Sequence, residues 1–363
     1  MARRIGLLTL PLHTNYGGIL QVVALYGLLA GQGREVTLFR TGPDRPVLRL
    51  AIAELLRRLP FQNIGGLRAR HREIAAHAPF LKRYLPRMTR ILRNRAQLSD
   101  EVRERGLEVF IVGSDQVWRS EFRLGTDFAN YFLDFVGNEV GKVAYAASFG
   151  HSRWQEGPDM TARIASFLAR FRMVGVREET GVEICRETFG RTDAKLVLDP
   201  TLLMPAGFYG EMIGAPRQSS GKVLMKYVLD PVKELGALEA SALEALGHGA
   251  TVRGIYLDRQ ERQATVPEWL RAFRDADFVL TDSFHGMAFS IIFGKQFVAL
   301  VNAGRGEDRF LSLARQLGLE DRLVFTGGEG SWPARAIDYA EVAVRLERRR
   351  AESLAVLMEA MGE

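Results

Sequence analysis

Short apolar runs alternate with segments of helical periodicity along the first part of the chain. Runs of apolar residues predict buried strands at 5–10, 36–39, 107–112, 142–146, 173–176 and 196–198. Apolar positions at helical spacing predict helices at 17–30 and 162–171, and another around 181–186. Because strands alternate with helices, this part should form parallel βαβ units.

A second series of the same kind follows a stretch rich in Gly, Pro and Ser at 205–221. It predicts strands at 223–228, 251–256, 278–280 and 296–301, and helices at 232–246, 266–274, 287–293, 308–317 and 334–361. The predicted fold is α/β, with two Rossmann-like domains facing a cleft, as in the glycosyltransferase-B type. We expect domains at 1–200 and 201–335, with a helix at 336–363 packing back across both.

Composition adds few constraints. The chain has 363 residues, of which 47% are hydrophobic and 25% charged, as in ordinary globular proteins. No apolar run approaches the roughly 20 residues of a membrane span, and the chain begins directly with a predicted strand, so we expect a cytoplasmic protein. The single cysteine, Cys185, cannot form an internal disulfide and is interpreted as a packing residue. The six histidines lack metal-ligand spacing, so no metal is predicted.

Positive charge is concentrated in residues 45–105, predicted as a basic helical insertion in the first domain. The segment holds 15 Lys or Arg and 5 Asp or Glu, a net charge of +10, whereas the whole chain carries +6. Residues 47–59 read as an amphipathic helix, which would suit an anionic membrane surface or a diphosphate-bearing partner. An ordinary solvated helix face is the alternative. Aromatic residues are sparse and no nucleic-acid motif is present, so nucleic acid is not expected as a partner.

His285 stands where a predicted strand passes into a predicted helix, in the sequence Thr281-Asp282-Ser283-Phe284-His285-Gly286. In open α/β sheets ligands bind at such junctions, and a helix N-terminus favours anions. We therefore predict that His285 holds a phosphate or donates a proton. A partly buried histidine with a purely structural role is the alternative.

The first strand-to-helix junction lacks the Gly-x-Gly-x-x-Gly spacing of dinucleotide-binding proteins, which argues against a dehydrogenase. Its polar and aromatic residues suit a sugar, and its glycines allow close approach of a ligand. The candidate residues are His13, Asn15, Tyr16, Gly17 and Gly18. The alternative is a loop whose glycines serve helix packing alone.

The strand at 107–112 runs into Gly113-Ser114-Asp115-Gln116-Val117-Trp118. A carboxylate, an amide and an indole together suit carbohydrate recognition, and Asp115 could also remove a proton from a sugar hydroxyl. Asp115 could instead cap a following helix, and the two roles are compatible.

Three arginines lie at predicted ligand-binding edges. Arg177 follows the strand at 173–176, where it could clamp a phosphate or carboxylate or form a surface ion pair with Glu178 or Glu179. Arg305 and Arg309 lie in and after a Gly-Arg-Gly loop that follows the last predicted strand, a position that favours anion capture.

Six blocks, in this order, resemble the polysaccharide pyruvyl transferase family. They lie at 9–18, 113–118, 176–178, 199–201, 281–286 and 302–309. The resemblance implies transfer of a pyruvyl group from phosphoenolpyruvate to two hydroxyls of one sugar, which yields a cyclic ketal and phosphate. Phosphoenolpyruvate would be a co-substrate, and no cofactor is predicted.

The resemblance also distributes roles among the residues. His285 and Asp115 are the predicted catalytic residues, and His285, Ser283 and Gly286 are placed at the donor. Some family members carry an arginine two residues before this histidine, where this chain has Ser283, so Arg305, Arg309 and Arg177 are the expected substitutes. The first domain should present the acceptor sugar through His13, Asn15, Tyr16, Gly17, Gly18, Gln116 and Trp118.

Bacterial members of the family commonly modify sugars carried on a lipid diphosphate, or repeats of capsule and exopolysaccharide. The resemblance therefore implies a sugar acceptor that can be polyprenyl-diphosphate-linked, with contact to the inner membrane face through 45–105. Two alternatives stay open at this point. One is a sugar-nucleotide-dependent glycosyltransferase of the same fold, and the other is a non-catalytic module that binds a glycan or lipid diphosphate.

Overall fold

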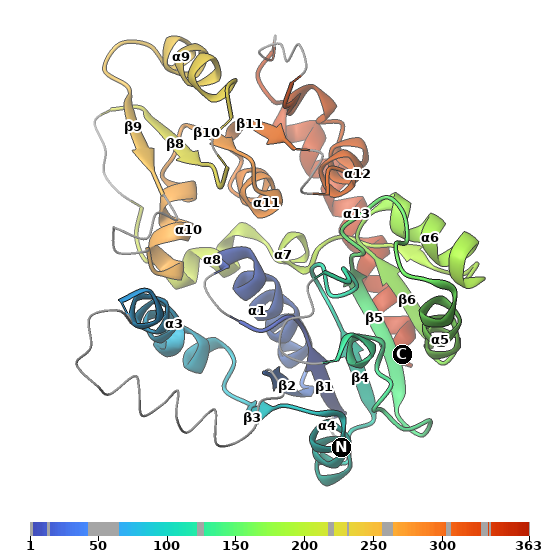
Figure 1. Ribbon diagram of the computed structural model, residues 1–363. Coiled ribbons are helices and arrows are strands. Elements are labelled where there is room, and N and C mark those ends of the chain that lie inside the picture. Colours follow the sequence, from blue (N-terminus) through green and yellow to red (C-terminus); the bar gives the residue numbers. More distant parts are fainter. Residues whose placement is uncertain are drawn as a thin grey trace.

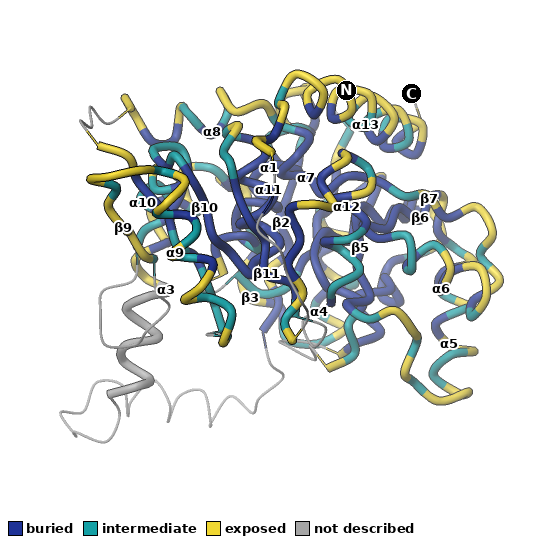
Figure 2. Tube along the Cα trace, turned by 90° about the horizontal axis from the view of Figure 1, so that it is seen from above, coloured by how far each residue is buried: buried dark blue, intermediate teal, exposed yellow. Residues whose placement is uncertain are grey.

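A computed structural model describes residues 3–12, 15–42, 65–121, 127–216, 221–230, 232–255, 264–302, 306–327, 333 and 335–362. The described chain forms two parallel β-sheets with helices packed around them (Figure 1). The short helices α7 (Pro200–Leu203) and α8 (Ala206–Ile213) lie between the sheets. The central strands of both sheets are buried along most of their length, which is why their sequences are nearly continuous apolar runs (Figure 2).

The first sheet has seven strands in the order β3-β2-β1-β4-β5-β6-β7, all parallel. Their bounds are β1 Arg4–Leu8, β2 Glu35–Thr41, β3 Met88–Leu92, β4 Val109–Val112, β5 Gly141–Ala147, β6 Met173–Val176 and β7 Lys195–Leu196. The order reverses direction between β1 and β4, as in a doubly wound sheet.

The second sheet has five parallel strands in the order β12-β11-β10-β8-β9. Their bounds are β8 Val223–Tyr227, β9 Thr251–Gly254, β10 Phe278–Thr281, β11 Gln296–Val301 and β12 Leu323–Phe325. Two Rossmann-like sheets, each covered by helices, make this a fold of the glycosyltransferase-B type, as predicted.

Helices connect the strands and close the molecule. Their bounds are α1 Tyr16–Gly31, α3 Gly65–Tyr84, α4 Arg95–Arg105, η2 Phe128–Phe132, α5 Pro158–Leu168, α6 Glu179–Phe189, α7 Pro200–Leu203, α8 Ala206–Ile213, α9 Leu235–Leu246, α10 Val266–Arg274, α11 Phe284–Ile292, α12 Asp308–Leu317, η4 Glu320–Arg322 and α13 Tyr339–Ala360. No helix in the described part of the chain combines the length and hydropathy of a membrane span.

One apolar core joins the two halves. Tyr16 of α1 stacks on Trp269 of α10 with ring centroids 5.6 Å apart, and its hydroxyl donates a hydrogen bond of 2.6 Å to the carbonyl of Ala264. Nearby, Tyr209 of α8 packs edge-on against Phe289 of α11 at 4.9 Å. The halves therefore meet through buried side chains, and the residues at this junction are held in fixed positions.

Helix α13 contacts both halves. The Ser353 hydroxyl accepts a hydrogen bond of 3.0 Å from the amide of Leu198, after β7. Arg349 donates to the Leu196 carbonyl at 3.2 Å and to Oε1 of Gln316, on α12, at 2.9 Å. This helix thus ties the end of the first sheet to the second half (Figure 1).

Several element bounds differ from those predicted. Strand β3 and helix α4 lie within 45–105, so part of the basic segment extends the first sheet and is not a purely helical insertion. Apolar and polar residues alternate poorly in this segment, which also carries exposed arginines, so the sequence did not predict this edge strand. Helix α11 begins at Phe284, not at 287, so His285 lies inside its first turn. Strand β7 ends at Leu196, two residues earlier than predicted.

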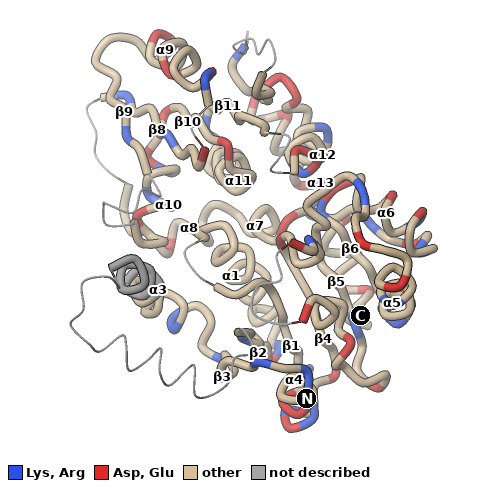
Figure 3. Tube along the Cα trace, viewed as in Figure 1, with Lys and Arg blue, Asp and Glu red and all other residues tan. Residues whose placement is uncertain are grey.

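Much of the positive charge in the described part of 45–105 is paired, and α4 carries both signs (Figure 3). The pairs are Arg87 with Glu35, Arg95 with Asp134, Arg103 with Asp100 and Arg105 with Glu101. Nearby carboxylates therefore offset the charge of these four arginines. The amphipathic helix predicted at 47–59 lies outside the described residues.

Candidate active site

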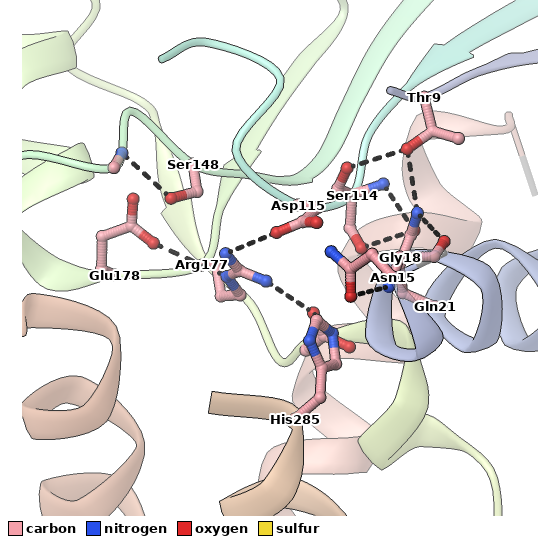
Figure 4. A network of polar contacts seen from close by, with 12 residues as sticks. Thr9, Asn15, Gly18, Gln21, Ser114, Asp115, Ser148, Arg177, Glu178 and His285 are labelled. Carbon is pink, nitrogen blue, oxygen red and sulfur yellow. Dashed lines mark hydrogen bonds and ion pairs between the residues drawn. The ribbon is translucent and has the colours of Figure 1, made fainter. Parts of the chain in front are cut away.

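Polar residues that follow three strands meet between the two sheets (Figure 4). Asp115 follows β4, Arg177 follows β6, and His285 lies in the first turn of α11 directly after β10. The carboxyl ends of parallel strands are where α/β proteins bind ligands. The two sheets therefore bring these distant residues into one cluster at the expected edge.

Arg177 is the centre of this cluster. Its side chain is 2% exposed, its Nη2 donates to Oδ1 of Asp115 at 3.2 Å and its Nη1 donates to Oδ2 of Asp199 at 3.0 Å. Its guanidinium carbon lies 4.6 Å from the ring centroid of Phe284, a cation–π distance. Arg177 is therefore a buried, fixed cation, and the surface ion pair considered from the sequence is wrong.

Asp199 links Arg177 to His285, and the sequence assigned it no role beyond its family block. Its Oδ1 accepts hydrogen bonds from the amide and hydroxyl of Thr201 at 3.0 and 2.7 Å, which caps α7. Its Oδ2 lies 3.7 Å from Nε2 of His285. Burial alone would raise the pKa of Asp199, but His285, Arg177 and the Thr201 amide outweigh burial and hold the pKa well below its usual range. The sequence Asp-Pro-Thr is typical of a helix start and could have indicated this capping role.

His285 packs against the backbone of Gly17, across the junction of the two halves. A Cβ atom at Gly17 would lie 2.0 Å from Nδ1 of His285 and 2.2 Å from its Cγ, so only glycine fits there. His285 is 6% exposed, and its Nε2 makes no hydrogen bond within the described part of the chain. The two predicted ligand loops, one from each half, are thus in direct contact.

Asp115 adopts an unusual backbone conformation, with φ of 73°. Its carbonyl accepts hydrogen bonds from the amides of Val117 and Ser148 at 2.8 and 3.0 Å, which tie this loop to the end of β5. Burial opposes ionisation of Asp115, but Arg177 and His285 outweigh burial and lower its pKa. Residues 116–121 contain a bend and turns but no helix, so the predicted helix-capping role for Asp115 is wrong.

Glu178 and Arg309 complete the cluster, and Glu178 was missed as a site residue. Glu178 is 2% exposed, and its Oε1 accepts a hydrogen bond of 3.1 Å from the Phe149 amide. Burial raises the pKa of Glu178, and the charges of Arg177 and Arg309 offset only part of that effect. Burial and the charge of Arg177 lower the pKa of Arg309 to about 10. Two guanidiniums therefore share one poorly solvated region.

One pocket borders the cluster, and a second pocket lies next to the first. The first is narrow and is lined by Ser148, Gly150, His151, Glu178, Gly306, Asp308 and Arg309. The second is an open surface pocket of about 330 Å³, lined by Ser152, Arg153, Trp154, Glu183, Ile184, Glu187 and Thr188. Ser152 directly follows His151, and Glu183 acts electrostatically on Asp308, so the two pockets are adjacent.

Two predicted residues serve as helix caps. The side-chain oxygen of Asn15 accepts a hydrogen bond of 3.2 Å from the Gly18 amide and caps α1. The Ser283 hydroxyl accepts one of 3.4 Å from the Gly286 amide and caps α11. A Cβ at Gly286 would lie 2.1 Å from Thr281 Oγ1, so this glycine lets α11 start close to β10.

Two aromatic residues predicted to stack on a sugar are instead core residues. Trp118 is 1% exposed, stacks on Phe132 at 5.1 Å and donates from Nε1 to the Tyr131 carbonyl at 2.9 Å. Tyr16 is fully buried against Trp269. Neither ring has a free face, which corrects the prediction. The apolar neighbours of both rings come from other segments, so the sequence did not reveal their burial.

The remaining predicted residues differ in position. Gln116 is 5% exposed, and its Nε2 lies close to Gly150 and to Gly306 of the opposite half. His13 and Arg305 lie outside the described residues. Over the described ranges, no three His, Cys, Asp or Glu side chains are grouped to hold a metal ion, and the absence of metal stays a prediction.

The chain is similar in structure to known proteins of low sequence identity. A putative UDP-N-acetylglucosamine 2-epimerase from Listeria monocytogenes matches with a TM-score of 0.52 and 9% identity, over 97% of this chain and 91% of that one. The UDP-GlcNAc 2-epimerase from Neisseria meningitidis matches with a TM-score of 0.48 and 10% identity, over 99% and 94%. No curated protein sequence matches significantly. The family model for polysaccharide pyruvyl transferase matches residues 15–304. The chain therefore belongs to the polysaccharide pyruvyl transferase family.

Proposed function

We propose that this transferase moves a pyruvyl group from phosphoenolpyruvate to two hydroxyls of a sugar, in a surface polysaccharide or its lipid-linked precursor. Protonation of C3 of the donor makes C2 electrophilic, and the first sugar hydroxyl adds to C2. Phosphate leaves, the second hydroxyl adds, and each hydroxyl gives up its proton to a base. The products are a cyclic ketal and hydrogen phosphate: one of the two hydroxyl protons replaces the proton given to C3, and the other leaves with phosphate.

The observation that carries this proposal is the buried cation cluster at the junction of the halves. Arg177 is held by two carboxylates, and the guanidinium carbons of Arg177 and Arg309 lie 4.6 and 5.8 Å from the same Phe284 ring centroid. Burial and repulsion by Arg177 lower the pKa of Arg309 to about 10. A small, highly charged anion bound there would relieve this repulsion. We assign donor binding to Arg309 and His285, with Arg309 in place of the arginine that some family members carry at the position of Ser283.

On the acceptor side, Asp115 is the proposed base. Its pKa is held low next to Arg177, so it is ionised at neutral pH and able to accept a proton from a hydroxyl. The open pocket around Trp154 has hydroxyl, carboxylate and guanidinium groups beside an indole, which suits a glycan. Because Tyr16 and Trp118 are buried, we place the acceptor sugar at this pocket.

The direct test is to incubate the protein with phosphoenolpyruvate and candidate glycans, free and polyprenyl-diphosphate-linked. Phosphate release together with the mass gain of one pyruvyl ketal is the expected result, and both should be lost in His285→Ala. Turnover with a sugar nucleotide and none with phosphoenolpyruvate would instead support a glycosyltransferase. Ligand binding without turnover, unaffected by His285→Ala, would support a binding module.

Membrane association is a separate part of the proposal. The basic segment 45–105 would hold the enzyme at the inner membrane face by attraction to anionic lipids. Sedimentation with vesicles containing phosphatidylglycerol at low salt should recover the protein in the pellet. Recovery in the supernatant at low salt would refute this association and leave pyruvyl transfer unaffected.

A further inference from the structure

Glu178 is a buried carboxyl group with no role in the pyruvyl transfer steps proposed for Asp115, His285 and Arg309. It stands at the start of α6 but makes no side-chain capping bond there. Its Oε1 is held by the Phe149 amide, whereas its Oε2 makes no hydrogen bond within the described residues. The same side chain lines the narrow pocket beside Arg309. One oxygen of a 2% exposed carboxyl thus adjoins the proposed donor site.

Charged and titratable groups surround Glu178 on every side. Arg177 Nε lies 3.8 Å from its Oε2, Arg309 and Asp308 reach the pocket from α12, and His151 reaches it from the loop after β5. The Cys185 thiol, on α6, lies close enough to interact electrostatically with Glu178. Burial is the largest influence, and the pKa of Glu178 is raised in spite of the two arginines.

The pKa values of two carboxyl groups in the site are therefore shifted in opposite directions. Asp115 shares Arg177 at 3.2 Å and has a lowered pKa, whereas Glu178 has a raised one. Enzymes that need an acid and a base at one pH separate two carboxyls in this way, by environment alone. Binding of an anion at Arg309 would disfavour the charged form of Glu178 further.

We propose that Glu178 is the proton donor of pyruvyl transfer, giving its proton to C3 of the enolpyruvyl group. The C=C π electrons form the new C–H bond, C2 becomes the electrophile, and the Glu178 carboxylate then takes a proton from an attacking hydroxyl. This assignment rests on the proposed function. It makes Glu178 the acid at C3 and Asp115 a base for a hydroxyl that adds to C2.

Calorimetry of phosphoenolpyruvate binding tests the assignment without any acceptor. Titrations at roughly pH 5 to pH 9, in buffers of different ionisation enthalpy, measure protons taken up on binding. Wild type should take up a proton over part of this range, and Glu178→Gln should lose that uptake while its Kd changes by less than about fivefold. The glutamine carbonyl can still accept the Phe149 amide hydrogen bond, so the fold is preserved.

Glu179→Gln is the matched control, because the Glu179 carboxylate, next to Glu178 in the sequence, is 41% exposed and pairs with Arg315 on the surface. It should behave like wild type. If Glu178→Gln takes up as many protons as wild type throughout the range, Glu178 is not the donor. If wild type binds no phosphoenolpyruvate, the proposed function itself fails, which distinguishes the two outcomes.

Turnover gives an independent measure once an acceptor is known. Glu178→Gln should lower kcat by about 10²- to 10⁴-fold with little change in KM for phosphoenolpyruvate, as for loss of a general acid. It should also remove the limb of the pH profile that requires a protonated group, and Glu178→Asp should restore part of the rate. Circular dichroism should match wild type. A kcat within about threefold of wild type would overturn the assignment.

Discussion

Gly17 and His285 lie in contact across the junction of the two halves, at positions 268 residues apart in the chain. The histidine ring occupies the space where a Cβ of residue 17 would stand, with Nδ1 only 2.0 Å from that position. Because this contact joins α1 to α11, the start of the first helix decides where the proposed donor-binding ring can sit.

Gly17→Ala should therefore displace His285 or separate the two halves. We expect phosphoenolpyruvate binding, measured by calorimetry, to weaken by at least tenfold, because the added methyl group cannot share the space of the ring. Gly31→Ala is the control, since a Cβ at the other end of α1 meets no atom within 4 Å. Equal affinity of the two variants for phosphoenolpyruvate would mean that donor binding does not depend on the position of His285.

Asp199→Asn should destabilise the protein, because it removes the charge that holds Arg177 and His285. Breaking a buried pair costs about 3 to 5 kcal/mol, and we expect the lower end because Arg177 keeps Asp115. Urea unfolding measures this loss. Asp193→Asn, at a surface pair with Arg191, is the control and should cost less than about 1 kcal/mol.

The same pair predicts the direction of the acid response. The pKa of Asp199 is depressed in the folded protein, so its contribution is present above the unfolded pKa of about 4 and is lost as pH falls below it. The unfolding free energy of wild type should drop more steeply below about pH 4 than that of Asp199→Asn. Parallel curves for the two proteins would contradict the depressed pKa.

Arg309→Gln should weaken phosphoenolpyruvate binding by about 10- to 100-fold, because a charge-assisted hydrogen bond contributes about 1.5 to 3 kcal/mol. Binding should also depend less on salt than in wild type. Arg315→Gln removes an exposed arginine from the same helix and serves as the control. Loss of affinity in both variants alike would point to general surface charge and not to a clamp.

Tyr16→Phe should lower stability modestly and leave phosphoenolpyruvate binding unchanged. The phenol is buried, and its hydrogen bond to Ala264 joins the halves, so its loss should cost roughly 0.5 to 1.5 kcal/mol. Urea unfolding and calorimetry measure the two effects. A large rise in acceptor KM without loss of stability would restore the earlier sugar-contact assignment.

Ser152→Trp should fill part of the open pocket beside Trp154. If the acceptor sugar binds there, its KM should rise by at least tenfold while the Kd of phosphoenolpyruvate stays unchanged. Gln155→Trp places the same indole on a neighbouring exposed residue that does not line the pocket. An unchanged acceptor KM in Ser152→Trp would exclude this pocket as the acceptor site.

The sequence by itself determined the parallel α/β architecture and the edge at which ligands meet. Strands buried on both faces require nearly continuous apolar runs, such as 109–112 and 278–281, and these were visible locally. The sequence did not predict β3 and β12, which are both edge strands. Strand β3 carries exposed residues, and β12 has only 3 residues. Polar residues just after strands, such as Asp115, Arg177 and His285, followed from the same local pattern.

Only the tertiary structure decided which of those residues are buried together. Trp118 and Tyr16 are covered by side chains from distant segments, and no local pattern records that. Glu178 and Glu179 are the sharpest case, because they are adjacent and chemically identical. The chain turns from β6 into α6 between them, so one carboxyl is 2% exposed beside Arg177 and the other is 41% exposed. Burial in the folded molecule, and not residue type, separates the proposed acid from a surface charge.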